Sequence, residues 1–268
     1  MNINKPEYKA NLLFNLINNY PIEGNESSFK MSFKTFNKIR FLIGINSHNF
    51  DITKLINICS QMLMPEQFQY LLKQNFSKSN LVLFGFEEHK NYCIYKVYLE
   101  FWEKNKQIVQ KSNNNYKPLL QYIGFKWNAF DNSKNLITKY HYYPLISINT
   151  IFNLLEKIYN CKYQNSLKIV KDIINFSAKR IDCKKDSFIY LHSTDDKGMR
   201  NSYDINFYKA KVQLKDIKTF INHILINYEI EHFLMQSFIE KIQNKIFGHL
   251  SGGFDKQGND FLTIYYEI

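Results

Sequence analysis

Residues 81–102, Leu81-Val-Leu-Phe-Gly-Phe-Glu-Glu-His-Lys-Asn-Tyr-Cys-Ile-Tyr-Lys-Val-Tyr-Leu-Glu-Phe-Trp102, contain two strand-like arms on either side of a polar turn. Apolar and polar side chains alternate along the second arm, with Tyr95, Val97 and Leu99 on one parity and Lys96, Tyr98 and Glu100 on the other. Successive side chains of a strand point to opposite faces, so the alternation predicts an antiparallel hairpin with one apolar face and one polar face.

The same design of two arms around a turn recurs along the chain. Three further pairs are Gln121–Phe130 with Leu136–Tyr143, Phe188–His192 with Tyr203–Lys209, and Phe247–Gly252 with Phe261–Glu267. Their turns are rich in Asp, Asn, Ser and Gly, which are favoured in turns. A fifth pair, Phe29–Phe36 with Lys38–Ile45, is predicted to turn near Asn37.

Between the hairpins apolar side chains recur about every 3.6 residues instead of every second residue, which predicts helices. The clearest apolar stripes run over Ile52–Leu63, Ile148–Ile158 and Ile217–Tyr228. Two helices are predicted within Ser147–Lys179, with a break near Tyr163, and the helical segment Leu214–Lys245 is predicted to be broken as well.

Helices that join successive hairpins can all cover the same face of one antiparallel sheet. About ten strands are more than a twisted open sheet carries comfortably, whereas a closed sheet accommodates them. The sequence therefore predicts an α+β fold over residues 1–268. We expect a single domain in which ββα repeats form a closed antiparallel β-barrel with its helices outside.

The composition indicates a folded protein with an anionic partner. The hydrophobic fraction of 45% and the aromatic fraction of 16% exclude wholesale disorder. Lys plus Arg number 35 against 24 Asp plus Glu, a net charge of +11, which favours nucleic acid, a membrane surface or a phosphorylated small molecule as partner. An AT-rich coding sequence also over-uses Asn, Lys, Ile, Phe and Tyr. The positive charge alone therefore does not distinguish these partners from one another, or any of them from codon bias. The chain has no long basic run of the kind that binds nucleic acid.

Membrane and metal signals are missing from the sequence. The opening Met1-Asn-Ile-Asn-Lys-Pro6 has no apolar core of a secretory signal, and the longest apolar runs are too short to span a bilayer. The four cysteines, Cys59, Cys93, Cys161 and Cys183, form no CxxC pair, and the seven histidines form no HxxxH group. We expect a cytoplasmic protein with reduced core thiols and no protein-held metal.

The polar strand faces suggest what the barrel binds. If the helices cover the apolar parity, then Lys96, Tyr98 and Glu100 face the interior, as do Asp204 and Tyr208. Lys and Arg would neutralise a diphosphate, and tyrosine faces would stabilise an adjacent cation. One alternative is an open sheet that binds nucleic acid by stacking and phosphate contacts. Another is a barrel that carries a small ligand without chemistry.

Three segments resemble parts of the ABBA-type aromatic prenyltransferases, whose barrel is built from αββα repeats. Arg40-Phe-Leu-Ile-Gly-Ile45 resembles the Arg-Phe-Leu-Leu segment of the cyanobactin prenyltransferases. Lys96-Val-Tyr-Leu99 resembles the Lys-containing strand that these enzymes share with the fungal dimethylallyl tryptophan synthases. Phe261-Leu-Thr-Ile-Tyr-Tyr266 resembles the aromatic final strand of both groups.

This resemblance implies an enzyme of natural-product biosynthesis. It would transfer a dimethylallyl or geranyl group from a prenyl diphosphate to a peptide or aromatic acceptor through an allylic cation, with Mg²⁺ as the expected cofactor. By role, the resemblance implies Arg40, Lys96, Lys139 and Lys126 as diphosphate contacts, Tyr98, Tyr208 and Tyr265 as a shield around the cation, and Glu26 and Glu100 as candidate general bases. Lys139 and Lys126 are alternatives for one position. Ser32 stands near the Glu of the tyrosine-specific enzymes, so the acceptor stays open.

Overall fold

The computed structural model describes residues 5–111, 117–160, 163–181, 188–198, 200–255 and 257–268. Cys161 and Cys183 lie outside the described residues. Cys59 and Cys93 are buried free thiols, as predicted, and burial raises the pKa of each to about 12. None of the helices in these ranges is long and apolar enough to cross a membrane.

The strands form an 11-stranded sheet in the order β11-β10-β9-β8-β7-β6-β5-β4-β3-β1-β2, and β11 also pairs with β1. The strands are β1 (Gly24–Ser32), β2 (Thr35–Asn37), β3 (Arg40–Asn46), β4 (Leu81–Glu88), β5 (Cys93–Glu100), β6 (Leu119–Asn128), β7 (Asn135–Tyr143), β8 (Ile189–Asp195), β9 (Asn201–Asn206), β10 (Phe247–Phe254) and β11 (Asp260–Glu267). Because the order returns to β1, the sheet is closed. The predicted closed antiparallel barrel with outer helices is confirmed.

The helices connect the hairpins, as the sequence predicts. They are α1 (Pro6–Ile17), α2 (Ile52–Gln61), α3 (Glu66–Phe76), α4 (Trp102–Lys111), α5 (Ile148–Tyr159), α6 (Gln164–Ala178), α7 (Lys218–Asn227) and α8 (His232–Ile242), with short 3₁₀ turns η1 (Ser47–Asn49), η2 (Tyr208–Ala210) and η3 (Leu214–Ile217). The predicted breaks separate α5 from α6 and α7 from α8.

The chain divides into two compact units, and each is described by itself. Unit 1 contains Met1–Glu26, Ile39–Asn115 and Leu120–Tyr140, and unit 2 contains Ser27–Lys38, Tyr116–Leu119 and His141–Ile268. Strands β1, β6 and β7 contribute residues to both units.

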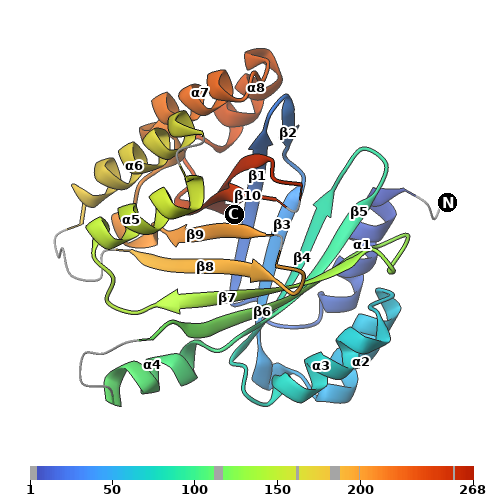
Figure 1. Ribbon diagram of the computed structural model, residues 1–268. Helices are drawn as coiled ribbons and strands as arrows, with labels where there is room; N and C mark the ends of the chain where they lie inside the picture. Colours follow the sequence, from blue (N-terminus) through green and yellow to red (C-terminus); the bar gives the residue numbers. More distant parts are fainter. Residues whose placement is uncertain (1–4, 112–116, 161–162, 182–187, 199, 256) are drawn as a thin grey trace. The chain divides into compact units, whose positions relative to one another are not determined.

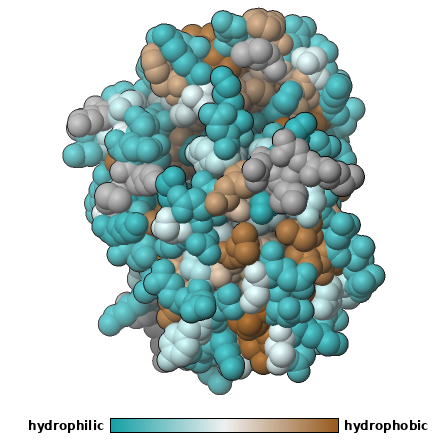
Figure 2. Space-filling model, turned by 90° about the vertical axis from the view of Figure 1, so that its right-hand side faces the viewer, coloured by the Kyte–Doolittle hydropathy of each residue, from teal (hydrophilic) through white to brown (hydrophobic). Residues whose placement is uncertain are grey.

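In unit 1 the apolar parity of the β4–β5 hairpin packs against α2 and α3. Phe84 pairs with Val97 across the hairpin, and both are buried in one hydrophobic core with Leu55 of α2 and Phe68 of α3. The Asp51 side chain accepts a hydrogen bond from the Thr53 amide and so fixes the start of α2. The polar parity of the same hairpin faces away from this core. The side of the molecule in Figure 2 is hydrophilic over most of its area, with scattered hydrophobic groups.

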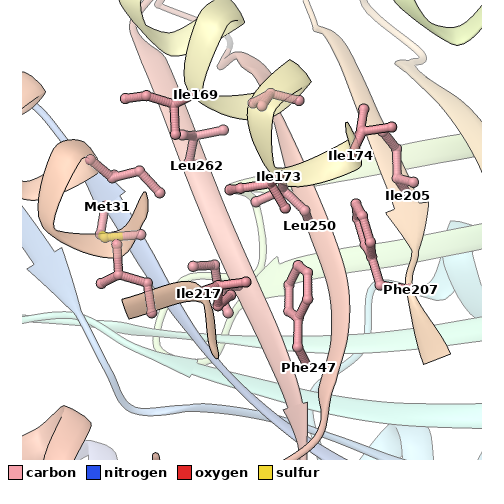
Figure 3. Packing of buried hydrophobic residues seen from close by; sticks show 14 of the residues in the cluster. Met31, Ile169, Ile173, Ile174, Ile205, Phe207, Ile217, Phe247, Leu250 and Leu262 are labelled. Carbon is pink, nitrogen blue, oxygen red and sulfur yellow. The ribbon is translucent and has the colours of Figure 1, made fainter. Parts of the chain in front are cut away.

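In unit 2, helices α5 to α8 cover one face of β8 to β11 (Figure 1). Ile173 and Ile174 of α6 pack with Ile205 of β9, Leu250 of β10 and Leu262 of β11 (Figure 3). The Ser147 hydroxyl caps α5 by accepting from the Thr150 amide, and α5 ends at Asn160 in the left-handed conformation. These local signals explain why the apolar stripe of α5 stops where it does.

Three local predictions are wrong. The strand predicted over Tyr203–Lys209 ends at Asn206, and Tyr208 lies in the 3₁₀ turn η2. The first hairpin does not turn near Asn37: the chain turns at Phe33 and Lys34, where Lys34 has φ 52°, and Ser32 pairs with Thr35. Trp102 does not end a strand but begins α4. This helix is tied to β6 by Asn105, whose buried amide donates to the Leu120 carbonyl and the Gln121 side chain. A polar anchor of this kind leaves no apolar stripe to detect.

Candidate functional site

The strands of unit 1 carry a polar face opposite the core beneath α2 and α3, which we call the inner face of unit 1. The strand register defines it, because the pairs that alternate with the core residues are Arg40 with Glu87, Gly85 with Lys96, Lys96 with Lys126, Tyr98 with Gly124, and Glu100 with Tyr122. Charged and phenolic side chains from β3, β4, β5 and β6 therefore lie on this face.

A buried ionic cluster lies on the inner face of unit 1. The Lys96 ammonium donates to Glu87 Oε2 at 2.6 Å, and the Arg40 guanidinium lies 2.5 Å from Glu87 Oε1. The same Oε1 lies 3.1 Å from His89 Nε2, and the His89 ring stacks on Tyr92. Arg40 and Glu87 are each 7% exposed and Lys96 is 8% exposed.

Two cations share one carboxylate in this cluster. Arg40 and Lys96 both contact Glu87. Removing charges from water is costly unless they are paired, so the Glu87 carboxylate stabilises both cations where they are. A guanidinium and an ammonium held side by side are the groups that bind phosphate oxygens.

A second group on the inner face places a cation between two phenol rings. Lys126 Nζ donates to the Tyr140 hydroxyl at 3.1 Å and lies 5.7 Å from the Tyr98 ring centroid and 5.6 Å from that of Tyr140. The Tyr98 ring lies over Gly124, where an added Cβ would come within 2.6 Å of two ring carbons. The faces of the Tyr98 and Tyr140 rings therefore both lie near a positive charge, which aromatic faces stabilise.

Glu100 orients a third tyrosine rather than standing free. Its Oε2 accepts from the Asn80 amide at 2.7 Å, and its Oε1 accepts from the Tyr122 hydroxyl at 2.5 Å. The Tyr122 ring in turn meets the Tyr140 ring edge to face. Both carboxylate oxygens of this candidate base are thus occupied.

The other predicted site residues lie on β7, β1, η2 and β11. Lys139 is exposed, and it is on the opposite parity of β7 from Tyr140, which contacts Lys126. The structure therefore brings Lys126, and not Lys139, to the inner face of unit 1. Glu26 is half-buried on β1. Tyr208 and Tyr265 belong to unit 2, where both rings contact His249.

Sequence reasoning missed Glu87 and Tyr140. Glu87 stands at the end of β4, within a run of polar residues that is typical of a turn. The alternation of side chains along β4 could have identified it. Leu83, Gly85 and Glu87 lie on the face of β4 that does not contact the core, so the carboxylate lies on the same face as Lys96. Tyr140 carries the same kind of signal on β7.

The inner face does not fit a protein-held metal. Among the described residues, no group of three or more His, Cys, Asp or Glu side chains could hold a metal ion. Glu87 is already shared by two cations and Glu100 by two hydrogen-bond donors. Mg²⁺ prefers several oxygen ligands in octahedral geometry, which these side chains do not supply.

No protein-family model and no curated protein matches this chain. Solved structures do. The 5-dimethylallyl tryptophan synthase from Streptomyces coelicolor, in complex with DMASPP and Trp, has a TM-score of 0.64 at 9% identity, over 97% of this chain and 88% of that chain. Prenyltransferase PriB, in a ternary complex with L-tryptophan and dimethylallyl thiolodiphosphate, has a TM-score of 0.59 at 8% identity, over 91% and 79%.

AnaPT from Neosartorya fischeri has a TM-score of 0.57 at 8% identity, over 91% of this chain and 78% of that chain. At such low identity the likeness establishes the fold. This chain has the fold of the ABBA-type aromatic prenyltransferases, in agreement with the resemblance of its three segments. The alternative of an open sheet is not favoured, because the strand order closes on β1.

Proposed function

We propose that this protein transfers a prenyl group from a prenyl diphosphate to an electron-rich acceptor. The observation that carries the proposal is the Glu87 carboxylate held between Arg40 and Lys96 on a polar strand face. The fold supports it, since solved structures of the same fold include a complex with dimethylallyl thiolodiphosphate and L-tryptophan.

In this proposal a diphosphate takes over the cations that Glu87 now holds. A guanidinium offers two parallel donors to phosphate oxygens and an ammonium offers a compact charge, so Arg40 and Lys96 suit the two phosphate groups. We assign Lys126, rather than the exposed Lys139, to the third basic position.

The chemistry that we propose separates charge. The C–O bond of the allylic diphosphate breaks, and both of its electrons leave with the diphosphate, where the cations stabilise them. The allylic cation is stabilised by the faces of Tyr98 and Tyr140, and aromatic side chains keep water from capturing it. The acceptor then forms the new bond to the prenyl carbon and loses a proton. Tyr208 and Tyr265 remain predicted members of the shield.

Mg²⁺ enters this proposal only as an ion that the diphosphate itself binds. The described side chains offer no cluster for it, so we assign it no protein ligand. The diphosphate oxygens and water are the ligands that this ion prefers when the protein contributes few.

The test is turnover by wild type and four variants. Dimethylallyl and geranyl diphosphates are incubated with L-tryptophan, L-tyrosine and short peptides that contain them, and products are identified by mass spectrometry. Arg40→Ala, Lys96→Ala and Lys126→Met should each lower the rate by about 10²–10³-fold, because each removes a group that stabilises developing charge. The matched control Lys139→Ala should retain the wild-type rate.

Thermal unfolding of each variant shows whether the fold survives. Lys126→Met is the safeguard, because Lys126 contacts the Tyr98 and Tyr140 rings and methionine keeps much of its length. Prenyl transfer at the wild-type rate by both Arg40→Ala and Lys96→Ala would contradict the proposed site. No transfer by the wild type to any acceptor would contradict the function.

A further inference from the structure

The turn of the β4–β5 hairpin brings a histidine to the carboxylate of the ionic cluster. Residues 89–92 connect the two strands, and the His89 amide donates to the Tyr92 carbonyl at 2.8 Å, which closes the turn. The two rings stack, with centroids 4.2 Å apart and planes at 11°. The position of the His89 ring is therefore set by the same hairpin that carries Glu87 and Lys96.

The Nε2 nitrogen of His89 lies beside the Glu87 carboxylate without a hydrogen bond between them. Nε2 is buried and lies 3.1 Å from Glu87 Oε1. Among the residues that the structure describes, none is aligned to form a hydrogen bond with this nitrogen. The same Oε1 contacts Arg40, and Oε2 accepts from Lys96. A small rotation of the carboxylate would therefore give Glu87 a further partner on its own hairpin.

The protonation of His89 decides how strongly it attracts this carboxylate. Neutral imidazole has one N–H, whereas imidazolium has two and carries a positive charge, so it can only donate to Glu87. The His89 side chain is 28% exposed and the Glu87 side chain 9%, so solvent can supply the proton to His89. Protonated His89 would then form an ion pair with Glu87.

The groups around His89 single it out as the one that titrates near neutral pH. Among the described residues, the titratable groups against its ring are Glu87 of β4 and Tyr92 of the turn. Glu87 in turn contacts Arg40 of β3 and Lys96 of β5. Partial burial and the nearby Glu87 carboxylate raise the pKa of Tyr92, so its hydroxyl stays neutral where imidazole titrates.

We propose that His89 is a positioning residue of the diphosphate site that acts through Glu87. Protonated His89 draws the carboxylate away from Arg40 and Lys96, and the two cations then bind the diphosphate. The proton comes from solvent when the diphosphate binds, and it returns to solvent when the diphosphate leaves and Glu87 goes back to the cations. This inference rests on the proposed diphosphate site, and all of its residues belong to unit 1.

The exchange replaces the contacts that Glu87 gives up. A diphosphate on Arg40 and Lys96 takes donors that Glu87 now uses, and loss of a partner from a buried ion pair is costly. A charge-assisted hydrogen bond from protonated His89 offsets that cost. Anion binding and protonation of His89 therefore favour each other. Because the complex holds the proton more tightly, the affinity is highest at low pH and falls as pH rises through the titration of the imidazole.

The experiment measures the affinity for inorganic pyrophosphate by titration calorimetry from about pH 6 to about pH 8, where imidazole titrates. His89→Phe keeps a ring against Tyr92 but cannot be protonated. The ratio of wild-type affinity to His89→Phe affinity cancels the titration of pyrophosphate itself. This ratio should fall by about fivefold or more over that range, as for typical coupled sites. The control His48→Gln, which changes an exposed histidine of η1 in the same unit, should follow wild type.

A double-mutant cycle tests whether His89 acts through Glu87. In the Glu87→Gln background, His89→Phe should no longer change the pH dependence, because no carboxylate remains to be drawn away. His89→Gln should give the same result as His89→Phe, and it serves if the phenylalanine variant does not fold. Thermal unfolding of each variant reports on the fold.

Two outcomes would overturn the inference alone. One is a ratio that does not change with pH while the wild type binds pyrophosphate. The other is a pH-dependent loss in His89→Phe that persists without Glu87, because His89 would then bind the anion directly. Failure of the wild type to bind pyrophosphate at any pH would count against the proposed diphosphate site, and against this inference with it.

Discussion

At the scale of single residues, the decisive feature is that one carboxylate serves two buried cations. Glu87 compensates Arg40 and Lys96, each less than a tenth exposed. Removal of one partner from a buried pair leaves an uncompensated charge, at a cost of about 3–5 kcal/mol. The carboxylate is thus both a structural support and the internal competitor of any incoming diphosphate.

Replacement of Glu87 by Gln should reveal both roles. Glu87→Gln should unfold at a lower temperature than wild type, because Arg40 and Lys96 each lose a buried ion-pair partner. Inorganic pyrophosphate should stabilise the variant more than it stabilises wild type, since the anion then binds without displacing a carboxylate. Thermal unfolding with and without pyrophosphate measures this. The control Glu66→Gln alters an exposed residue of α3 and should behave as wild type. An equal response of Glu87→Gln and wild type would count against the exchange.

Part of the candidate site could be predicted from the sequence. Arg40 was identifiable by resemblance, and Lys96 by resemblance and by strand parity; both contact the Glu87 carboxylate. Glu87 could not be found in the same way, because a polar residue beside a turn is ordinarily solvated and only the fold shows that it is buried.

At the scale of elements, β5 and β6 fit together because a large side chain on β5 faces a glycine on β6. Gly124 lies opposite Tyr98 in the register, and the ring occupies the space where a Cβ would be. The tyrosine face is therefore held flat against the neighbouring strand, and Lys126 lies two residues further along β6.

An alanine at position 124 should tilt this ring. Gly124→Ala places a methyl group within 2.6 Å of the Tyr98 ring, so the ring must shift away from Lys126. We expect about a tenfold fall in kcat for prenyl transfer, because a poorly placed π face stabilises the cation less, with little change in pyrophosphate affinity. Steady-state kinetics and calorimetry test this. Gly24→Ala is the control, since a Cβ there meets nothing within 4 Å. Equal kcat values for the two variants would remove the role assigned to the Tyr98 face.

Elements with strong periodicity were predictable, and elements held by single polar contacts were not. The alternation in β4 and β5 and the apolar stripe of α5 each specify one buried face, which fixes both type and place. Helix α4 has one buried residue among those assigned to it, Asn105, and the short β2 depends on Lys34 adopting φ 52°. Neither cause leaves a repeating pattern in the sequence.

At the scale of the whole molecule, stability should depend on a buried carboxyl of unit 2. Asp260 is 5% exposed at the start of β11, where its Oδ2 accepts from the Ser166 hydroxyl of α6 and from the Tyr228 hydroxyl that follows α7. Burial raises its pKa to about 6, against an ordinary value of 3.8. The folded chain therefore binds a proton more tightly there than the unfolded chain does.

The sign of the pH dependence follows from this difference. The contribution of Asp260 to stability is greatest below about pH 4 and falls, by about 3 kcal/mol, as pH rises to about 6 and above. Asp260→Asn should abolish that fall. Urea unfolding at about pH 4.5 and about pH 7 measures the difference, with Asp196→Asn, an exposed aspartate, as control. The same slope in Asp260→Asn and wild type would show that another group is responsible.

The pairing that closes the sheet joins the first strand to the last. From β3 to β11 each strand lies beside its neighbour in sequence, whereas β1 must wait for β11. Hairpins can thus form one after another during synthesis, but until the final strand arrives two rows of backbone groups, on β1 and on β10, lack their partners. A chain that ends before β11 would consequently expose two unpaired strand edges at once, and we expect it to aggregate.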